Sequence, residues 1–132
     1  MKINIIIPAF YPATVYGGPI FSSLHASEEI SKLDIDVYVS TTNANMKKKL
    51  DVKTNIWINF KDNLYVKYYN TSFIHTVSIP MFINTFNDIR KSDLVHIQSV
   101  FNISTIFFVG TSIYSFFVDI CHISAAILKL PQ

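Results

Sequence analysis

The sequence predicts an α/β fold, doubly wound around a mostly parallel sheet, and three observations support this class. Apolar runs typical of strands buried on both faces occur at Ile3–Pro8 and Leu94–Gln98. A segment with apolar residues at helical spacing follows the first run and precedes another strand pattern. A glycine pair and a proline stand between that strand and that helix, as in a βαβ unit. We therefore expect residues 1–132 to form one domain, without repeats or a linker.

The composition excludes several classes of protein. Half of the 132 residues are apolar, the formal net charge is +2, and Cys121 is the single cysteine. A disordered tail, a disulfide scaffold and a broad basic surface for nucleic acid are therefore not expected. No pair of histidines has the spacing of metal ligands, so we predict no metal site. The mean hydropathy of +0.32 indicates a large sheet core, an exposed partner surface or membrane contact.

The first part of the chain predicts a strand, a loop, a helix and a second strand. Ile3–Pro8 is the buried strand, and Ala9–Gly18 is the loop. Pro19 suits the first turn of a helix, because its missing N–H costs nothing there. The helix is predicted over Ile20–Leu33, and the second strand over Asp36–Thr41. This βαβ unit should have a right-handed crossover.

Residues 43–69 begin with a polar segment and continue with two segments in which apolar and polar residues alternate. Asn43–Asn55 is predicted to be a loop, and its three lysines, Lys47 to Lys49, are either solvated or in contact with anionic lipid or phosphate. Ile56–Phe60 and Leu64–Tyr69 alternate between apolar and polar residues, and the three residues between them can turn. These two segments are expected to form a hairpin or two successive edge strands.

A second helix is predicted after Ser78, which can cap it, with Pro80 in the first turn and the end near Lys91. Its apolar face would contain Met81, Phe82, Thr85, Phe86 and Ile89. The strand Leu94–Gln98 follows. We expect a further helix from Asn102 or Ser104 to Phe117, and a last strand in the tail from Val118.

The stretch from residue 94 to 118 carries no fixed charge, and residues 100–118 are long enough to span a bilayer. A small membrane protein anchored by residues 100–118 is therefore one alternative. The many hydroxyl and amide side chains in this stretch favour a buried strand followed by a core helix. The apolar run at the N-terminus is too short for a signal-peptide core, so the expected compartment is the cytoplasm.

Candidate binding residues lie after the predicted strands, because ligands of open α/β sheets bind beyond the carboxyl ends of the strands. The three segments concerned are Ala9–Gly18, Thr41–Asn45 and Ser99–Asn102. Gly17 and Gly18 precede a helix N-terminus, which suits a phosphate or a sugar hydroxyl. The same pair could form only a tight turn. The glycine fingerprint of dinucleotide-binding folds is absent, which disfavours that class of ligand.

Several segments together resemble the start of family 4 glycosyltransferases of the GT-B type. The first is Lys2–Pro8, followed by Tyr11-Pro12 and by Gly17-Gly18-Pro19 with Ser22-Ser23. The resemblance continues in the segments Val37–Asn43, Asn63–Tyr69, Ser92–Gln98 and Val100–Thr105. It covers residues 1–108.

The resemblance implies two Rossmann-like domains facing each other across a cleft, of which this chain would be the first, acceptor-side domain. The loop of Gly17, Gly18 and Pro19 would approach the donor phosphates or the transferred sugar. The donor would be a nucleotide sugar, and transfer would proceed with retention and without a metal or other cofactor. The acceptor would be a glycan or a lipid-linked saccharide, with peripheral contact at the inner face of the membrane. Acceptor-side candidates are Tyr16, Thr42, Asn43, His96, Gln98, Phe101 and Asn102.

The sequence also departs from the family pattern. Asp34-Ile35 replaces the usual Gly-His after the first helix, and Gln98 replaces the second histidine of the H-x-H motif. Cys121–Ala126 stands where a motif like Ser-Pro-Arg-Gly is expected, so the last segment is atypical. The 132 residues do not include a donor domain, which suggests a truncated, frameshifted gene whose product is inactive alone. A complementing donor domain on a second polypeptide could restore activity. The other alternative is a non-enzymatic α/β interaction module.

Overall fold

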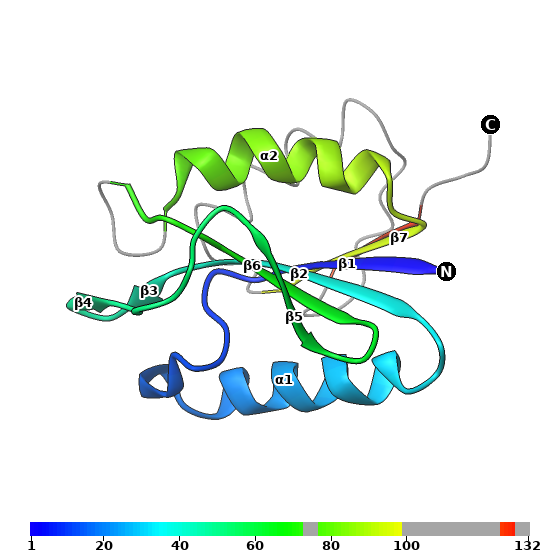
Figure 1. Ribbon diagram of the computed structural model, residues 1–132, viewed down its shortest axis with the longest axis horizontal. Helices are drawn as coiled ribbons and strands as arrows, with labels where there is room; N and C mark the ends of the chain where they lie inside the picture. Colours follow the sequence, from blue (N-terminus) through cyan, green and yellow to red (C-terminus); the bar gives the residue numbers. More distant parts are fainter. Residues whose placement is uncertain (73–76, 99–124, 129–132) are drawn as a thin grey trace.

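The computed structural model describes residues 1–72, 77–98 and 125–128, and it has a mixed α/β fold (Figure 1). Six strands form one sheet in the order β5-β6-β2-β1-β7-β8, and α1 and α2 lie on its opposite faces (Figure 1). The four central strands are parallel, and the edge strands β5 and β8 are antiparallel to their neighbours. The main elements are β1 (Lys2–Ile6), α1 (Gly18–Ser31), β2 (Asp36–Thr42), β5 (Trp57–Lys61), β6 (Leu64–Tyr69), α2 (Ile79–Arg90), β7 (Leu94–Ile97) and β8 (Ala125–Leu128).

The predicted βαβ unit is confirmed, with small shifts of its boundaries. β1 pairs in parallel with β2, so that Ile3 lies beside Val37 and Ile5 beside Val39. The first strand ends at Ile6 rather than Pro8, because a proline has no N–H to donate to the ladder. α1 begins two residues earlier than predicted, with Gly18 and Pro19 inside its first turn.

The predicted hairpin is also confirmed. β5 and β6 pair antiparallel, and Asn63 adopts a positive φ of 58° in the turn between them. β6 pairs in parallel with β2 over its whole length, from Leu64 to Tyr69. The hairpin therefore extends the parallel sheet by one strand and closes this side with an antiparallel edge.

The prediction of a plain loop over Asn43–Asn55 is wrong in part. β3 (Ala44–Asn45) and β4 (Lys48–Lys49) form a short antiparallel hairpin, and Met46 has a φ of 51° at its tip. The Lys49 ammonium group donates to Asn70 Oδ1 at 2.9 Å and to the carbonyl oxygen of Thr71 at 3.0 Å. Lys49 is thus a structural contact to the chain after β6, which residue type and spacing alone did not reveal.

The second helix begins and ends where the sequence predicts. Ser78 caps α2, because its Oγ accepts a hydrogen bond from the backbone N–H of Met81 at 3.3 Å. Met81, Thr85 and Ile89 are buried beneath the helix at i, i+4 and i+8. This spacing turns one face of α2 toward the sheet.

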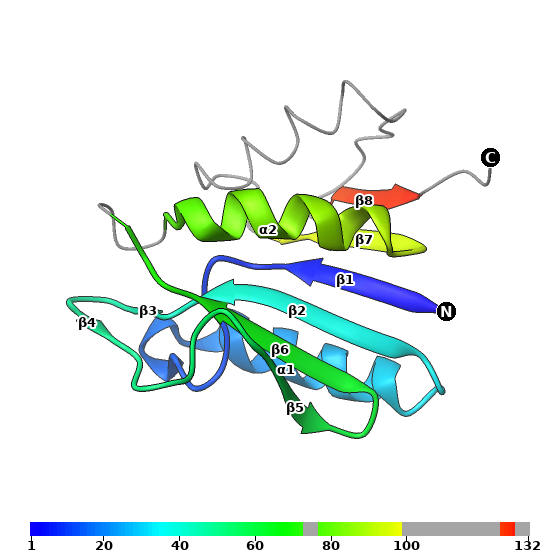
Figure 2. The ribbon, with the colours of Figure 1, turned by 45° about the horizontal axis from the view of Figure 1, so that its top comes forward.

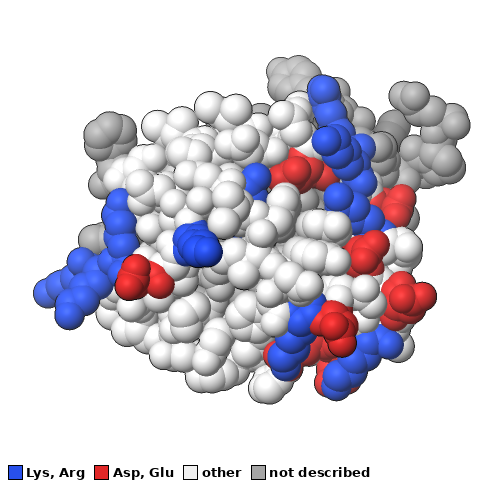
Figure 3. Space-filling view, viewed as in Figure 1, with Lys and Arg blue, Asp and Glu red and all other residues white. Residues whose placement is uncertain are grey.

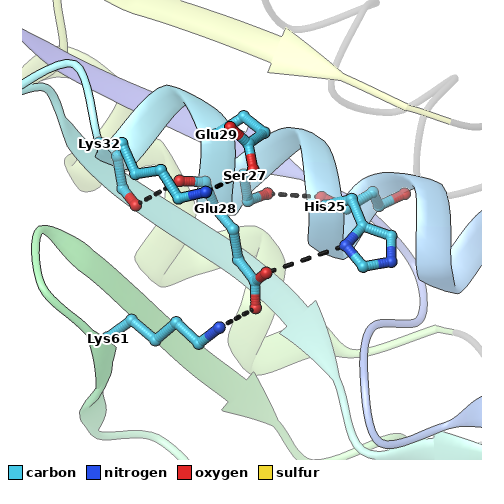
Figure 4. A network of polar contacts seen from close by, with 8 residues as sticks. His25, Ser27, Glu28, Glu29, Lys32 and Lys61 are labelled. Carbon is cyan, nitrogen blue, oxygen red and sulfur yellow. Dashed lines mark hydrogen bonds and ion pairs between the residues drawn. The ribbon is translucent and has the colours of Figure 1, made fainter.

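α1 is tied to the β5–β6 hairpin by an ion pair. The Glu28 carboxylate lies 2.6 Å from Lys61 Nζ and 3.8 Å from His25 Nδ1, while Lys32 pairs with Glu29 on the solvent side of the helix (Figure 4). Glu28 is only 16% exposed, so its contact with Lys61 is less screened than the surface pair. The contact fixes the turn of the hairpin against the middle of α1.

The predicted strand in the tail is present as β8, which pairs antiparallel with β7. The predicted helix over residues 102–117, and the alternative membrane span over 100–118, lie outside the described residues. Across residues 1–72, 77–98 and 125–128, no helix has the length and apolar character needed to cross a bilayer.

Candidate functional site

The carboxyl ends of β1 and β2 bring two of the predicted binding segments, Ala9–Gly18 and Thr41–Asn45, to one edge of the sheet, and the third, Ser99–Asn102, lies outside the described residues. β1 lies between β2 and β7 (Figure 2). The chain leaves β1 toward α1 and β2 on one side, whereas β7 lies on the other side of β1. The strand order therefore reverses at β1, and such a reversal is the point where open α/β sheets bind ligands.

The glycine pair lies at this point. Gly17 has φ 74° and ψ −143°, a backbone conformation that a residue with a side chain rarely adopts, and it caps the N-terminus of α1. A Cβ atom added to Gly17 or to Gly18 would meet no atom of the described residues within 4 Å. The space above both residues is open, so a ligand could approach this backbone closely.

Few backbone donors are left at this helix N-terminus. Pro19 has no N–H, and the N–H of Ile20 donates to the carbonyl oxygen of Gly17 at 3.1 Å. Among Gly18, Pro19 and Ile20, only Gly18 keeps an N–H for which the structure shows no protein acceptor. There is no acidic residue in the first turn to compete with an anion. The arrangement suits one anionic or hydroxyl oxygen rather than a fully enclosed phosphate.

Two of the acceptor-side candidates, Tyr16 and Thr42, form hydrogen bonds that join neighbouring loops. Tyr16 Oη accepts from the backbone N–H of Met46 at 2.8 Å, which joins the loop after β1 to the β3–β4 hairpin. The buried Thr42 hydroxyl donates to the carbonyl oxygen of Pro8 at 2.6 Å and accepts from the N–H of Ala44 at 3.2 Å.

Asn43 acts in the same way. Its Oδ1 accepts from the backbone N–H of Thr71 at 3.0 Å, and its Nδ2 lies 3.3 Å from Asn70 Oδ1. Asn43 is buried, and its side chain joins the end of β2 to the end of β6. Tyr16, Thr42 and Asn43 therefore shape the edge of the site, and their polar groups already have protein partners.

His96 and Gln98 lie on the α1 side of the sheet, next to the first turns of the helix. Gln98 Oε1 accepts from Ser23 Oγ at 2.9 Å. The His96 imidazole is half-buried, and burial lowers its pKa below 6.5, so the ring is neutral near pH 7. Both side chains line a hollow of about 350 Å³ between α1, β1 and β7. The last two candidates, Phe101 and Asn102, lie outside the described residues.

Ser23 belongs to this site but was not among the predicted site residues. The signal that could have found it is its position on the buried face of α1. Ile20, Ser23, Leu24 and Ser27 all lie on that face, where polar side chains are not expected without a partner. Ser23 Oγ bonds to both Pro19 O, at 2.6 Å, and Gln98 Oε1.

The charged side chains gather in two places. Figure 3 shows charged side chains gathered at the end of the sheet where the strands begin, and a second group of lysines over the β3–β4 hairpin. From Ile3 to Leu24 the sequence contains no charged residue. Within the described residues, no group of three or more His, Cys, Asp or Glu side chains is placed to hold a metal ion.

No family model, curated protein or solved structure matches this chain.

Proposed function

We propose that the chain is the acceptor-side domain of a retaining glycosyltransferase, which moves a sugar from a nucleotide-sugar donor to a glycan or a lipid-linked saccharide. The observation that carries this proposal is the open glycine pair at the N-terminus of α1, beside the point where the strand order reverses. An uncrowded backbone at this position allows close approach of a phosphate or sugar hydroxyl. The resemblance to family 4 glycosyltransferases over residues 1–108 supports the same assignment.

The strand order supports the finer description of the fold. Counted along the chain, the parallel strands lie in the order third, second, first, fourth, as β6-β2-β1-β7. This is the order in which a doubly wound, Rossmann-like sheet begins, and there the crossover from the third to the fourth strand lies on the face opposite to the first helix. α1 and α2 lie on opposite faces, in keeping with this description (Figure 1).

In this proposal the chain positions substrates and a second domain holds most of the donor. Gly18 N–H and the positive end of the α1 dipole would face a donor phosphate or the transferred sugar. Tyr16, Thr42 and Asn43 would keep the surrounding loops fixed. Transfer requires donor and acceptor to be held in line, so the domain alone is expected to bind substrate without catalysing transfer. The expected location is the cytoplasmic face of the membrane, with Lys47 and Lys48 of the hairpin toward anionic lipid.

A binding measurement with a single variant tests the proposal. Isothermal titration calorimetry with UDP-glucose, UDP-N-acetylglucosamine and GDP-mannose should detect binding of at least one of them to the full chain. Gly18→Trp should abolish it, because the indole would fill the open space above the glycine pair. Leu33→Trp, at the opposite end of α1 and 70% exposed before substitution, is the matched control and should bind like the wild type. Equal binding by the Gly18→Trp variant would contradict the proposal.

The alternative is a non-enzymatic interaction module in which the glycine pair only forms the turn. The positive φ of Gly17 favours it, because this conformation requires glycine whether or not a ligand binds. Mixing the chain with a separately expressed donor domain of a family 4 glycosyltransferase distinguishes the two. Transfer of labelled sugar, lost with Gly18→Trp, supports the enzyme, and binding of no nucleotide sugar supports the module.

A further inference from the structure

The hollow between α1 and the sheet has an apolar body. Its walls include Ile3 and Ile5 from β1, Ala26 and Ile30 from α1, and Leu94 from β7. Because side chains alternate along a strand, residues 3, 5, 94 and 96 share the face of the sheet that α1 covers. A volume of about 350 Å³ lies within the range of small-molecule sites, which is about 300–1000 Å³.

The polar groups of the hollow lie at one end. Ser22, Ser23, His96 and Gln98 complete its lining, and they belong to the first turns of α1 and the carboxyl end of β7. None of these side chains carries a charge near pH 7, since burial keeps the imidazole neutral. The hollow is therefore graded from a neutral polar end to an aliphatic end, which runs along β1 toward its beginning.

The polar end adjoins the glycine pair. Ser22 Oγ donates to the carbonyl oxygen of Gly18 at 3.1 Å, and Ser23 Oγ donates to that of Pro19 at 2.6 Å. A molecule whose head lies at these two serines could thus place its tail directly in the hollow, next to a donor held at Gly18. Burying a charged or strongly polar body among these aliphatic walls would cost free energy, whereas a hydrocarbon chain would gain it.

We propose that this hollow binds the hydrocarbon chain of a single-chain amphiphile whose head lies at the polar end, beside Ser22, Ser23 and Gln98. The inference rests on the proposed function in one respect, because it makes the lipid part of a lipid-linked saccharide a ligand of the same site. The hydrocarbon chain of the ligand would contact Ala26, Ile30, Leu94 and the two isoleucines of β1. His96 and Gln98 line the boundary between chain and head.

A chain-length series tests the proposal directly. Binding of alkyl phosphates from butyl to tetradecyl, below their micelle concentrations, is measured by calorimetry on the full chain. Each added methylene should raise the affinity about fourfold until the hollow is filled, after which the affinity should level off. An affinity that is independent of chain length, or one that rises over the whole series without levelling off, would overturn the proposal.

Two tryptophan variants of α1 locate the chain. Ala26→Trp places an indole in the hollow and should remove the dependence on chain length, and Lys32→Trp, at an exposed position on another side of the same helix end, should preserve it. Circular dichroism and thermal unfolding verify that both variants fold. If affinity increases with each methylene as steeply in the Ala26→Trp variant as in the wild type, the alkyl chain binds elsewhere, or another segment or copy of the protein covers the hollow. Either result overturns the proposal.

The experiment separates this inference from the proposed function. If alkyl phosphates bind in the hollow but no nucleotide sugar binds, the amphiphile site stands and the glycosyltransferase assignment fails. If nucleotide sugars bind and are lost with Gly18→Trp, but chain length has no effect, the assignment stands and the amphiphile site fails.

Discussion

The two faces of the sheet are built from different chemistry. The face under α1 is aliphatic and includes Ile5, Val39, Leu64 and Val66, packed against Leu24 of the helix. The face under α2 has a smaller apolar cluster, centred on Ile6, Met81 and Ile97. Both faces are covered by one described helix of similar length (Figure 2). The difference therefore lies in the side chains of the strands rather than in the architecture.

The α2 face buries more unpartnered polar groups than the α1 side of the sheet, where Thr41 Oγ1 is the one such group among the described residues. Asn4 Nδ2, Tyr69 Oη and Thr85 Oγ1 are buried and make no well-formed hydrogen bond among the described residues, although the Tyr69 hydroxyl lies near Thr85 and Asp88. Asp88 Oδ2 also accepts no hydrogen bond there, and its contact with Lys67 Nζ is a long ion pair of 4.0 Å. Such groups lose their contacts with water without full compensation. We infer that the α1 face supplies most of the stability of the domain.

The largest expected effect is on the α1 face. Leu64→Ala removes a fully buried side chain of β6 from the aliphatic cluster. The free energy of unfolding should fall by about 2–5 kcal/mol, because the substitution loses buried surface and leaves a cavity. Urea denaturation followed by circular dichroism measures the change. A loss below about 1 kcal/mol would contradict the central role assigned to this cluster.

Alkaline pH should weaken the same face at its carboxyl end. Burial raises the pKa of Tyr68 from 10 to about 12, and its hydroxyl donates to the carbonyl oxygen of Tyr11. The unfolded chain loses this proton at lower pH than the folded chain, so stability is complete below pH 10 and falls as the pH rises toward 12. The loss should reach about 2–3 kcal/mol.

Tyr68→Phe isolates that contribution. Denaturation of the wild type and of this variant is compared between pH 8 and about pH 12. The wild type should lose more stability than the variant over this range, whatever the difference between them at neutral pH. Parallel pH profiles would show that Tyr68 does not titrate with a raised pKa.

On the α2 face a substitution should stabilise the domain. Thr85 is fully buried, and its hydroxyl lies near that of Tyr69 but makes no well-formed hydrogen bond in the described residues, so the isosteric change Thr85→Val removes a poorly compensated polar group. The free energy of unfolding should rise by about 1 kcal/mol. Thr42→Val is the matched control, because the Thr42 hydroxyl is equally buried but makes two hydrogen bonds, and this variant should be less stable. A stabilised Thr42→Val variant, or a destabilised Thr85→Val variant, would remove the contrast between the faces.

The smallest effect concerns His96. Since burial lowers the pKa of its imidazole, the unfolded chain takes up the proton first as the pH falls below 6.5. Stability should therefore decrease from pH 7 toward pH 5.5, and His96→Gln should reduce this decrease. Thermal unfolding of both proteins across this range measures the difference. If stability decreases more steeply in the variant than in the wild type, the pKa of His96 is not lowered in the folded protein.

Sequence reasoning predicted the elements that have strong local signals. The caps and prolines at Ser78-Ile79-Pro80 and Gly17-Gly18-Pro19 fixed both helix starts to within two residues. Continuous and alternating apolar runs gave β1, β2, β6 and β7. The β3–β4 hairpin was missed, because it is held by Lys49 through contacts with Asn70 and Thr71, twenty or more positions away. No local pattern encodes such a contact.

The candidate site was predictable in position but not in detail. The glycine pair was placed at the carboxyl end of the sheet by the order of the elements alone. In contrast, Thr42 and Asn43 could be ranked as loop-holding residues only once their partners, Pro8 and Thr71, were known. The hollow beside Gln98 depends on how α1 lies over β1 and β7, and that packing is tertiary.

The antiparallel edge strand β5 has a consequence for how the protein behaves at high concentration. In the described residues β5 pairs with β6 alone, so its outer backbone groups could recruit a strand from another molecule. A register irregularity interrupts the strand between Asn59 and Lys61, and the charged Lys61 is held at its end by Glu28. Bulges and lysines at such positions discourage intermolecular strand addition, so this edge resists the growth of fibrous aggregates.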